Sequence, residues 1–317
     1  MTIRFGIQIE PQLGFDYSTV EKIALNAEKI GYHSIWSSDH FFLDTESEDK
    51  NCMEAWTLLA ALAAKTRTLR LGTLVTCNSY RYPAVLAKIA ATVDIISNGR
   101  LEFGIGAGWK EIEYRAYGIP FPSVKDRMDQ LEESLQIIKK LWMEPKVSYV
   151  GNHYQIKDAF SAPKPIQQLP PIFIGGTGKK RILNMVAKYA DYCNFGWFHD
   201  PKTIPELLDA LKRHCDKVNR DYDSVGKSYF ASVIVTETED ELETILTKRA
   251  KLRDMTLQEY KKSISNLNVF FGPPEVVQQG FEDLIALGFD YFQIMFPYPD
   301  DYQQSEKFTR LVLPNIK

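Results

Sequence analysis

The chain has 317 residues, of which 44% are hydrophobic and 25% are charged. This composition can bury a sizeable core, and α/β barrels commonly reach this length as one domain. The 38 basic and 41 acidic residues leave a net charge of −3, so we expect no nucleic-acid partner. No segment resembles a signal peptide or a membrane span, so we expect a cytoplasmic protein without membrane contact.

Neither the cysteines nor the histidines show a metal-binding pattern. The four cysteines form no C-x-x-C pair, and the five histidines show no H-x-H or H-E-x-x-H spacing. Zinc sites and disulfide frameworks depend on such spacings. We therefore expect no metal ion and no disulfide framework.

The first hundred residues alternate between short apolar segments and helical segments. Ser18 is a candidate N-cap for a helix over residues 19–30 that stops at Gly31. The acidic stretch 41–52 is expected to be a loop. Strands are predicted over residues 3–9, 33–37 and 69–76, and further helices over 53–65 and 83–98.

The fourth strand, in the segment LEFGIGAGW, ends in the alternating glycines 104, 106 and 108. Clustered glycine after an apolar run indicates a turn at which the backbone closely approaches something. A dinucleotide-binding turn is excluded, because the pattern G-x-G-x-x-G is not completed at Trp109 or Glu111. Two alternatives remain: a turn that meets a ligand at a barrel mouth, and a tight turn without a ligand.

The remaining two thirds of the chain continue the alternation. A long loop is expected over 110–122, a helix over 123–142, and a hairpin over 146–156 with Gly151-Asn152 at its tip. Residues 254–272 are ambiguous, with a helix before an apolar stretch at 268–271. The other predicted strands cover residues 172–174, 191–195, 228–235 and 290–295. The other predicted helices cover 179–189, 205–220, a segment from 240, 274–288 and 303–313.

Eight strand–helix units in strict alternation predict a parallel sheet closed into a (β/α)8 TIM barrel. We expect one domain over residues 1–317, with insertions in the strand-to-helix loops. Ligands of such barrels bind at the C-terminal strand ends. The strand ends predict a broad mouth, and its side chains include Glu10, Asp39, His40, Thr76, Trp109 and Trp197.

The fifth strand ends in Gly175-Gly176-Thr177-Gly178, directly before three basic residues. Backbone N–H groups at a helix start, together with the helix dipole, favour an anion. We prefer a phosphate site here to a flexible loop with solvated lysines. At the second strand, Asp39-His40 is either an acid–base or hydrogen-bonding pair, or a helix cap beside a surface histidine. Trp36, Trp109 and Trp197 either stack on a ring or belong to the core.

Three segments resemble the bacterial luciferase-like superfamily and occur in the same order: IWSSDHF, LGTLVTCNSYRYPAVLAKIAATVDIISNGRLEFGIGAGW and PPIFIGGTGKKRIL. Within it, Ser-Asp-His and Gly-Gly-x-Gly resemble the branch that uses the deazaflavin coenzyme F420 rather than FMN. This resemblance implies a non-prolyl cis peptide at Leu74-Val75, behind the central ring of the cofactor. It also implies cofactor contacts at Asp39, Leu74, Val75, Thr76, Gly106, Ala107, Gly108, Gly175, Gly176, Thr177 and Gly178, the last four with the phosphate.

His40 matches a histidine that transfers protons in the sugar-phosphate dehydrogenases of this branch. Those enzymes carry a glutamate where this chain has Trp109, which disfavours a sugar-phosphate substrate and leaves the catalytic role of His40 open. The bulky indole suits a flatter or more apolar small molecule. The substrate pocket is expected to include Glu10, Trp109, Glu113 and Trp197.

The expected activity is hydride transfer with F420 to or from a small organic substrate. An FMN-dependent monooxygenase that uses oxygen is the first alternative, and a flavin-binding protein without turnover is the second. The resemblance also implies a homodimer. A second apolar stripe on two helices supports it, unless helix 303–313 covers that surface. The residues concerned are Met53, Trp56, Leu58, Leu59 and Leu62, and Val85, Leu86, Ile89, Val93, Ile95 and Ile96.

Overall fold

The computed structural model describes residues 2–196, 198, 201–299 and 301–316. At the centre of this part of the chain, eight parallel strands form a ring. They are β1 (Arg4–Ile9), β2 (Ser34–Ser37), β3 (Arg70–Thr73), β5 (Leu101–Gly106), β8 (Ile172–Gly175), β9 (Tyr192–Gly196), β10 (Gly226–Val235) and β12 (Tyr291–Met295). Their order is β10-β12-β1-β2-β3-β5-β8-β9, and β9 pairs back to β10. The predicted closed (β/α)8 barrel is therefore confirmed.

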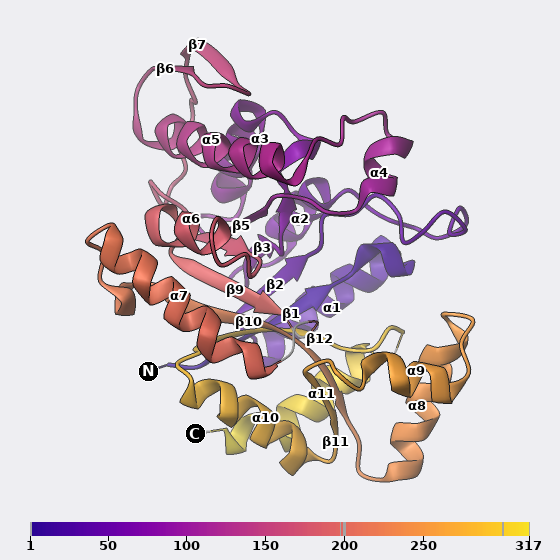
Figure 1. The fold of residues 1–317 in the computed structure, drawn as a ribbon. Coiled ribbons are helices and arrows are strands. Elements are labelled where there is room, and N and C mark those ends of the chain that lie inside the picture. Colours follow the sequence, from indigo (N-terminus) through magenta and orange to yellow (C-terminus); the bar gives the residue numbers. More distant parts are fainter. Residues whose placement is uncertain (1, 197, 199–200, 300, 317) are drawn as a thin grey trace.

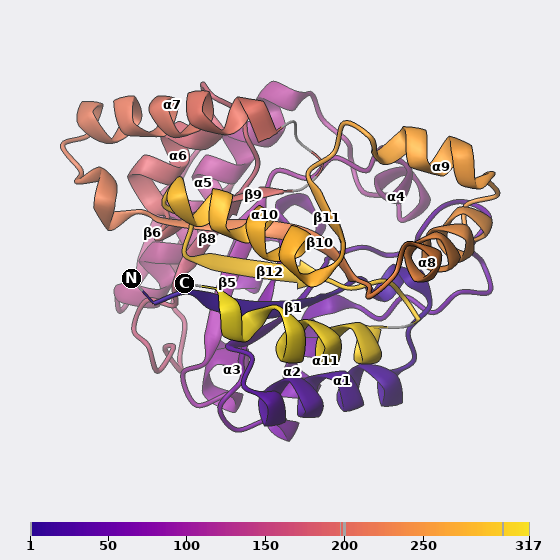
Figure 2. The ribbon, with the colours of Figure 1, turned by 90° about the horizontal axis from the view of Figure 1, so that it is seen from below.

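Helices follow the strands and cover the outside of the barrel (Figures 1 and 2). The covering helices are α1 (Tyr17–Ile30), α2 (Ala55–Lys65), α3 (Pro83–Ile96), α5 (Val124–Met143), α6 (Ile182–Tyr189), α7 (Ile204–Lys217), α10 (Pro274–Ala286) and α11 (Asp301–Leu311). Barrel strands are buried on both faces, which is why segments such as LEFGIG are almost entirely apolar. None of the helices in the described ranges is long and apolar enough to cross a membrane.

Several predicted element boundaries were wrong for local reasons. Asp16, not Ser18, caps α1, because its carboxylate accepts a hydrogen bond from the Thr19 N–H, while Ser18 Oγ donates to the same carboxylate. The third strand does not run unbroken to Thr76. It stops at Thr73 and resumes as β4 (Thr76–Cys77), and the peptide between Leu74 and Val75 is cis, as the resemblance implied.

One loop beyond the strands contains a helix that the sequence patterns did not predict, and one ambiguous region contains the helix that they did predict, followed by a strand. The expected loop 110–122 includes a short helix, α4 (Glu111–Ala116). The ambiguous region 254–272 folds as α9 (Leu257–Ile264) and β11 (Val269–Gly272). The predicted hairpin is confirmed as β6 (Val147–Val150) and β7 (Gln155–Ala159). At the turn of this hairpin, the N–H groups of residues 152–154 donate hydrogen bonds to the Glu133 carboxylate.

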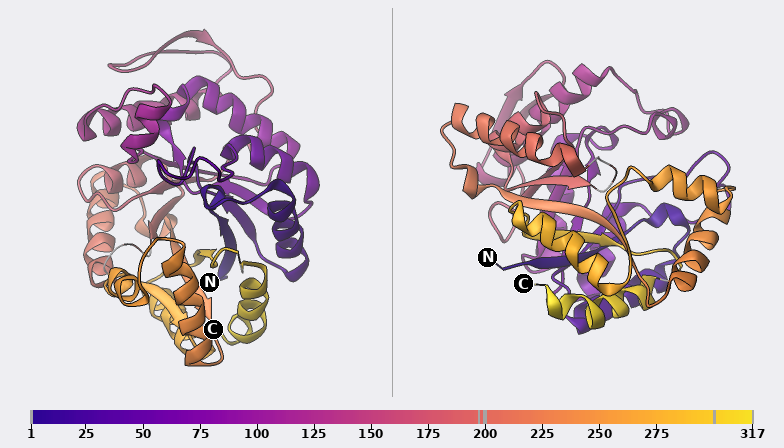
Figure 3. Two further views of the ribbon diagram at one scale, coloured as in Figure 1. Left: turned by 90° about the vertical axis from the view of Figure 1, so that its right-hand side faces the viewer. Right: turned by 60° about the horizontal axis from the view of Figure 1, so that its bottom comes forward.

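A second small core lies beside the barrel mouth. The last residues of β10 extend beyond the ring, where they pair with β11. Together with α8 (Glu239–Lys251) and α9, they enclose a cluster that includes Ile245, Leu246 and Tyr260. We call this segment, residues 236–272, the α8–α9 lobe. Figure 1 shows it and α4 on the right, at the C-terminal ends of the strands, and both chain ends on the left; Figure 3 (left) looks onto this mouth.

Glycines in β5 and β8 make room for the side chain of Val75. A Cβ added at Gly106 would lie 2.8 Å from Val75 Cγ2, and one at Gly175 would lie 3.0 Å from Val75 Cγ1. A Cβ at Gly104 would collide with the Thr73 carbonyl oxygen and also approach Val75. The close approach that the glycine pattern predicted at positions 104 and 106 is therefore to the chain itself, at the break between β3 and β4.

We predict that Gly106→Ala lowers the free energy of unfolding by about 1–3 kcal/mol, because the added methyl group overpacks a filled site. Urea unfolding followed by circular dichroism measures this change. In the background of Val75→Ala, where the colliding methyl groups are gone, the same substitution should cost distinctly less. An equal cost in both backgrounds would show that Val75 is not the obstacle.

Candidate active site

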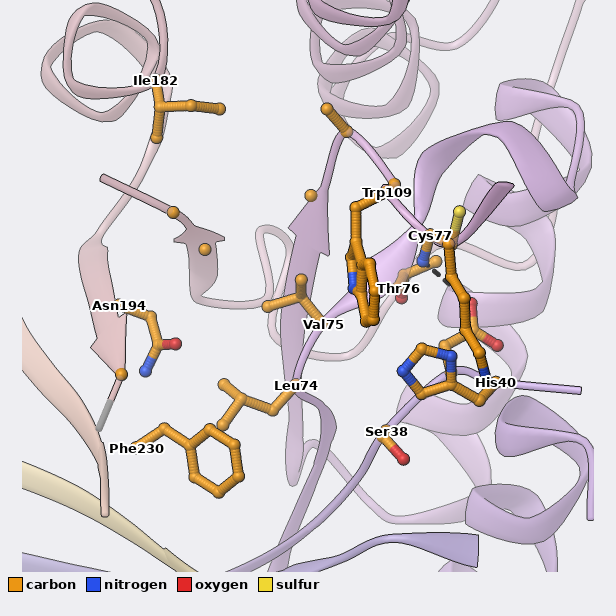
Figure 4. A pocket seen from close by; sticks show the side chains of 18 of the residues that line it. Ser38, His40, Leu74, Val75, Thr76, Cys77, Trp109, Ile182, Asn194 and Phe230 are labelled. Atoms are coloured by element: carbon orange, nitrogen blue, oxygen red, sulfur yellow. Dashed lines mark hydrogen bonds between the residues drawn. The ribbon is translucent and has the colours of Figure 1, made fainter. Parts of the chain in front are cut away.

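A cavity of about 770 Å³ opens at the barrel mouth, between the second-strand loop and the turn after β8 (Figure 4). Leu74 and Val75 lie between these two sides, with His40 and Trp109 on one and Asn194 and Ile182 on the other. The structure brings nearly all the predicted site residues to this cavity. They are Glu10, Asp39, His40, Leu74, Val75, Thr76, Gly106, Ala107, Gly108, Trp109, Gly175, Gly176, Thr177 and Gly178.

Two predicted pocket residues differ from the rest. Glu113 does not line the cavity but is fully buried on α4, behind His40. Trp197 lies outside the described residues. The sequence analysis missed several lining residues, among them Gln12, Asn194 and Phe230, and it used Ser38 only as part of the Ser-Asp-His motif. Asn194 lies on β9 at a predicted strand end, so the strand-end rule could have found it, whereas no signal in the sequence pointed to Gln12.

His40 is held from behind by the buried carboxylate of Glu113. Its Nδ1 lies 2.9 Å from Glu113 Oε2, so a proton on Nδ1 is donated to the carboxylate. Its Nε2 has no hydrogen-bond partner among the described residues, while the imidazole lines the cavity. This arrangement fixes the tautomer and leaves Nε2 available to accept a proton from a ligand. The predicted alternative of a surface histidine is wrong.

Glu113 collects donors from three separate segments. Beside His40, it accepts hydrogen bonds from the Phe41 N–H at 2.9 Å, the Tyr80 hydroxyl at 2.5 Å and Lys110 Nζ at 3.1 Å. Burial favours the neutral acid, but His40 and the other donors outweigh it and lower the pKa of Glu113 to about 2. The carboxylate is therefore ionised at neutral pH and ties the second-strand loop to α4.

Asp39 faces the cavity, but its charge is already matched. Arg81 binds its two oxygens at 2.7 and 2.9 Å, and the Cys77 N–H donates to the same carboxylate at 2.9 Å. Arg81 also pairs with Glu54, at the start of α2. This bidentate geometry is the strong form of an arginine–carboxylate pair. The predicted alternative, in which Asp39 caps a helix, is wrong.

Glu10 is joined to neutral hydrogen-bond donors. The amide of Gln8 donates to it at 2.8 Å and that of Gln12 donates to its other oxygen, while the Ser38 hydroxyl donates to Gln12 at 2.7 Å. Burial raises the pKa of Glu10, although His40 and the two amides act in the opposite direction. The site therefore holds two carboxylates with opposite pKa shifts beside one histidine, a pattern common where protons are transferred.

The turn after β8 differs from the prediction in two respects. The helix begins at Ile182 rather than at residue 179, and two of the three basic residues are paired with acids. Lys179 Nζ lies 2.5 Å from Glu206, and Arg181 lies 2.5 Å from Asp129. An anion at this turn would therefore meet backbone rather than these two cations. Gly176 has φ +120°, a conformation that favours glycine.

Trp36 and Trp109, two of the three tryptophans that the sequence offered as ring contacts, lie in different surroundings. Trp36 is fully buried in the barrel, which settles it as core. Trp109 is 71% exposed at the cavity, with its ring centroid 5.9 Å from that of His40 in an edge-on arrangement. An indole this exposed beside a cavity is available to contact a ligand.

We predict that Glu113→Gln lowers stability at pH 7 by about 1–3 kcal/mol, because buried donors lose a charged acceptor. The folded-state pKa of Glu113 is depressed from 4.5 to about 2. Its stabilisation is thus present above pH 4.5 and is lost as the pH falls toward 2. Urea unfolding at pH 7 and at pH 3 should show the two proteins converging in acid.

Glu111→Gln is the matched control, since Glu111 lies on the same helix in an exposed pair with Arg115. It should change stability by less than about 0.5 kcal/mol at either pH. A constant difference between wild type and Glu113→Gln across this pH range would contradict the assignment.

Comparison with known proteins shows which family this chain resembles in sequence. A family model described as luciferase-like monooxygenase matches residues 2–290. The F420-dependent glucose-6-phosphate dehydrogenase of Amycolatopsis mediterranei (strain U-32) is 35% identical over 211 residues, or 65% of this chain. The chain spans 61% of that relative's length.

Two solved structures share the fold over nearly the whole chain. An F420-dependent secondary alcohol dehydrogenase in complex with an F420-acetone adduct superimposes with a TM-score of 0.86 at 21% identity, covering 100% of both chains. Monooxygenase RslO1 from Streptomyces bottropensis has a TM-score of 0.83 at 19% identity, covering 99% of this chain and 100% of that one. With a family match that extends over most of the sequence, the chain belongs to the luciferase-like monooxygenase family.

Proposed function

We propose that this protein is an oxidoreductase that binds coenzyme F420 in the cavity and transfers a hydride to or from a small organic substrate. The observation that supports this proposal most is that three predicted cofactor-binding segments line one cavity. They are the strand end Ser38-Asp39-His40, the wall of Leu74 and Val75, and the turn Gly175–Gly178. The sequence similarity to an F420-dependent dehydrogenase supports the same choice of cofactor.

The residues present fit a deazaflavin. Leu74 and Val75 would give an apolar wall for the ring system, and Gly106, Ala107 and Gly108 line the same cavity. At Gly108, φ is +78° and a Cβ would lie 2.0 Å from the Tyr114 hydroxyl oxygen and 2.6 Å from Cys77 Sγ, so the packing of the chain itself requires glycine there. The turn 175–178 would hold the phosphate. Asp39 would meet the ring through a carboxylate that Arg81 already neutralises.

When bound, a deazaflavin accepts or supplies a hydride at its carbon five. The chain's own contribution is proton handling and orientation. Oxidation of an alcohol also releases the hydroxyl proton, and His40 Nε2 is the base oriented to receive it. Glu113 stabilises the resulting imidazolium, since its carboxylate is ionised and lies 2.9 Å from Nδ1.

An FMN-dependent monooxygenase is the second candidate, because the family model that matches the chain is described as luciferase-like monooxygenase. The same wall and turn would hold FMN. A flavin-binding protein without turnover is disfavoured, since α4 and the loop after β2 are tied together at His40: Glu113 on α4 bonds to the His40 ring and to the Phe41 N–H.

We predict tighter binding of F420 than of FMN, measured by fluorescence titration of each cofactor. Gly176→Asp should weaken F420 binding, because it places a carboxylate where the phosphate is expected. Gly176→Ala is the control, since it imposes the same backbone penalty at φ +120° without the charge. Micromolar FMN binding with no response to F420 would overturn the choice of cofactor, and equal affinities of the two variants would place the phosphate elsewhere.

We also propose a homodimer in the cytoplasm, with α3 at the interface. The expected stripe on α2 gives no support, because Trp56, Leu58, Leu59 and Leu62 are buried within the chain. On α3, however, Val85 is 55% and Ile96 is 42% exposed. The alternative that the C-terminal helix covers this face is wrong, since α11 packs against α1 and β10 instead (Figure 2).

We predict a particle of about twice the chain mass of 36.4 kDa by light scattering behind a sizing column. Val85→Glu should shift it toward one chain mass, because a charge on an apolar interface stays unpaired. Val150→Glu, at a 78% exposed position on the hairpin, is the control and should leave the mass unchanged. A wild-type mass near one chain at micromolar concentration would refute the dimer.

A further inference from the structure

Among the described residues, the part of the cavity around His40 is supplied with hydrogen-bonding groups, and the lysine and arginine side chains near it are already paired. Glu10, Gln12 and Ser38 form one connected wall, and its members are a carboxyl group, an amide and a hydroxyl. In its ionised form Glu10 repels an anion, and in its protonated form it is neutral. In neither state does this wall attract a phosphate.

The nearby cations are engaged elsewhere. Among the lining residues that the structure describes, Lys110 is the one lysine or arginine. Its ammonium donates to the Phe42 carbonyl and to Glu113, and lies 5.1 Å from the Phe42 ring centroid. The guanidinium of Arg81 lies behind Asp39 and is neutralised by two carboxylates. Binding a phosphoryl group here would require breaking a buried ion pair, which is unfavourable.

The remaining surface of this part is apolar. Trp109 stands beside His40, Phe230 lies across the cavity from it, and Leu74 lies between them (Figure 4). A ligand that covered the exposed indole would bury apolar surface and gain the associated free energy. The wall around Glu10 and His40 can meanwhile exchange hydrogen bonds with a single hydroxyl or carbonyl oxygen.

We propose that this protein acts on an uncharged alcohol, or the corresponding carbonyl compound, with an apolar body, and that it excludes phosphorylated sugars. The substrate oxygen meets His40 Nε2, and the apolar body covers Trp109. This inference rests on the proposed function, because it assumes that a cofactor occupies the side of the cavity with the glycine turn. It goes further by assigning Trp109 as the residue that determines specificity.

The test is equilibrium binding to the F420-loaded protein, measured by calorimetry with cyclohexanol and with glucose 6-phosphate as probes. We expect saturable binding of cyclohexanol and none of glucose 6-phosphate. Trp109→Ala should weaken cyclohexanol binding roughly tenfold, and Trp109→Phe should retain most of it. Phe160→Ala is the matched control, because Phe160 is 69% exposed and does not line the cavity, and its binding should equal wild type.

Saturable binding of glucose 6-phosphate that cyclohexanol displaces would overturn the proposal, as would cyclohexanol affinity unchanged in Trp109→Ala. F420 binding is titrated separately by its own fluorescence in every variant. A failure to bind F420 would contradict the proposed function. If F420 binds but glucose 6-phosphate binds better than cyclohexanol, only the proposed substrate class is contradicted.

Discussion

The packing of one valine side chain sets the geometry of the barrel mouth. Val75 lies where β3 stops and β4 has not begun, and its methyl groups occupy space that exists because neighbouring positions on β5 and β8 are glycines. With any larger residue at Gly106 or Gly175, the chain between Leu74 and Thr76 would have to move outward. The wall of the cavity therefore depends on a steric match between three strands, which must be satisfied before any ligand binds.

A second constraint, electrostatic rather than steric, organises the opposite side. The buried carboxylate of Glu113 receives donors from the loop after β2, from Tyr80 after β4 and from the segment that opens α4. A buried charge is tolerated only when it is surrounded by such partners. The loops of the mouth are thus arranged around one ion, and His40 takes its orientation from it.

The barrel could be predicted from sequence because each strand is a short apolar run and each helix has a clear periodicity. The positions of the site residues followed, since strand ends of a parallel barrel converge. Short elements could not be predicted: α4 has six residues and no side-chain cap, and β11 needs its pairing with β10. Contacts between distant segments were equally invisible, so Glu113 was expected in the pocket rather than behind His40, and Arg81 was not singled out as the partner of Asp39.

The α8–α9 lobe has an apolar core of its own, joined to the barrel through the end of β10. A segment with its own hydrophobic core can unfold as an independent cooperative unit. Amide hydrogens of Leu246 and Tyr260 should therefore exchange with solvent through partial openings that leave the ring of strands intact. The separate core also lets the rim of the mouth vary in sequence where its residues do not touch the barrel, whereas the Glu241–Lys307 pair with α11 and the packing of β11 on α10 stay constrained.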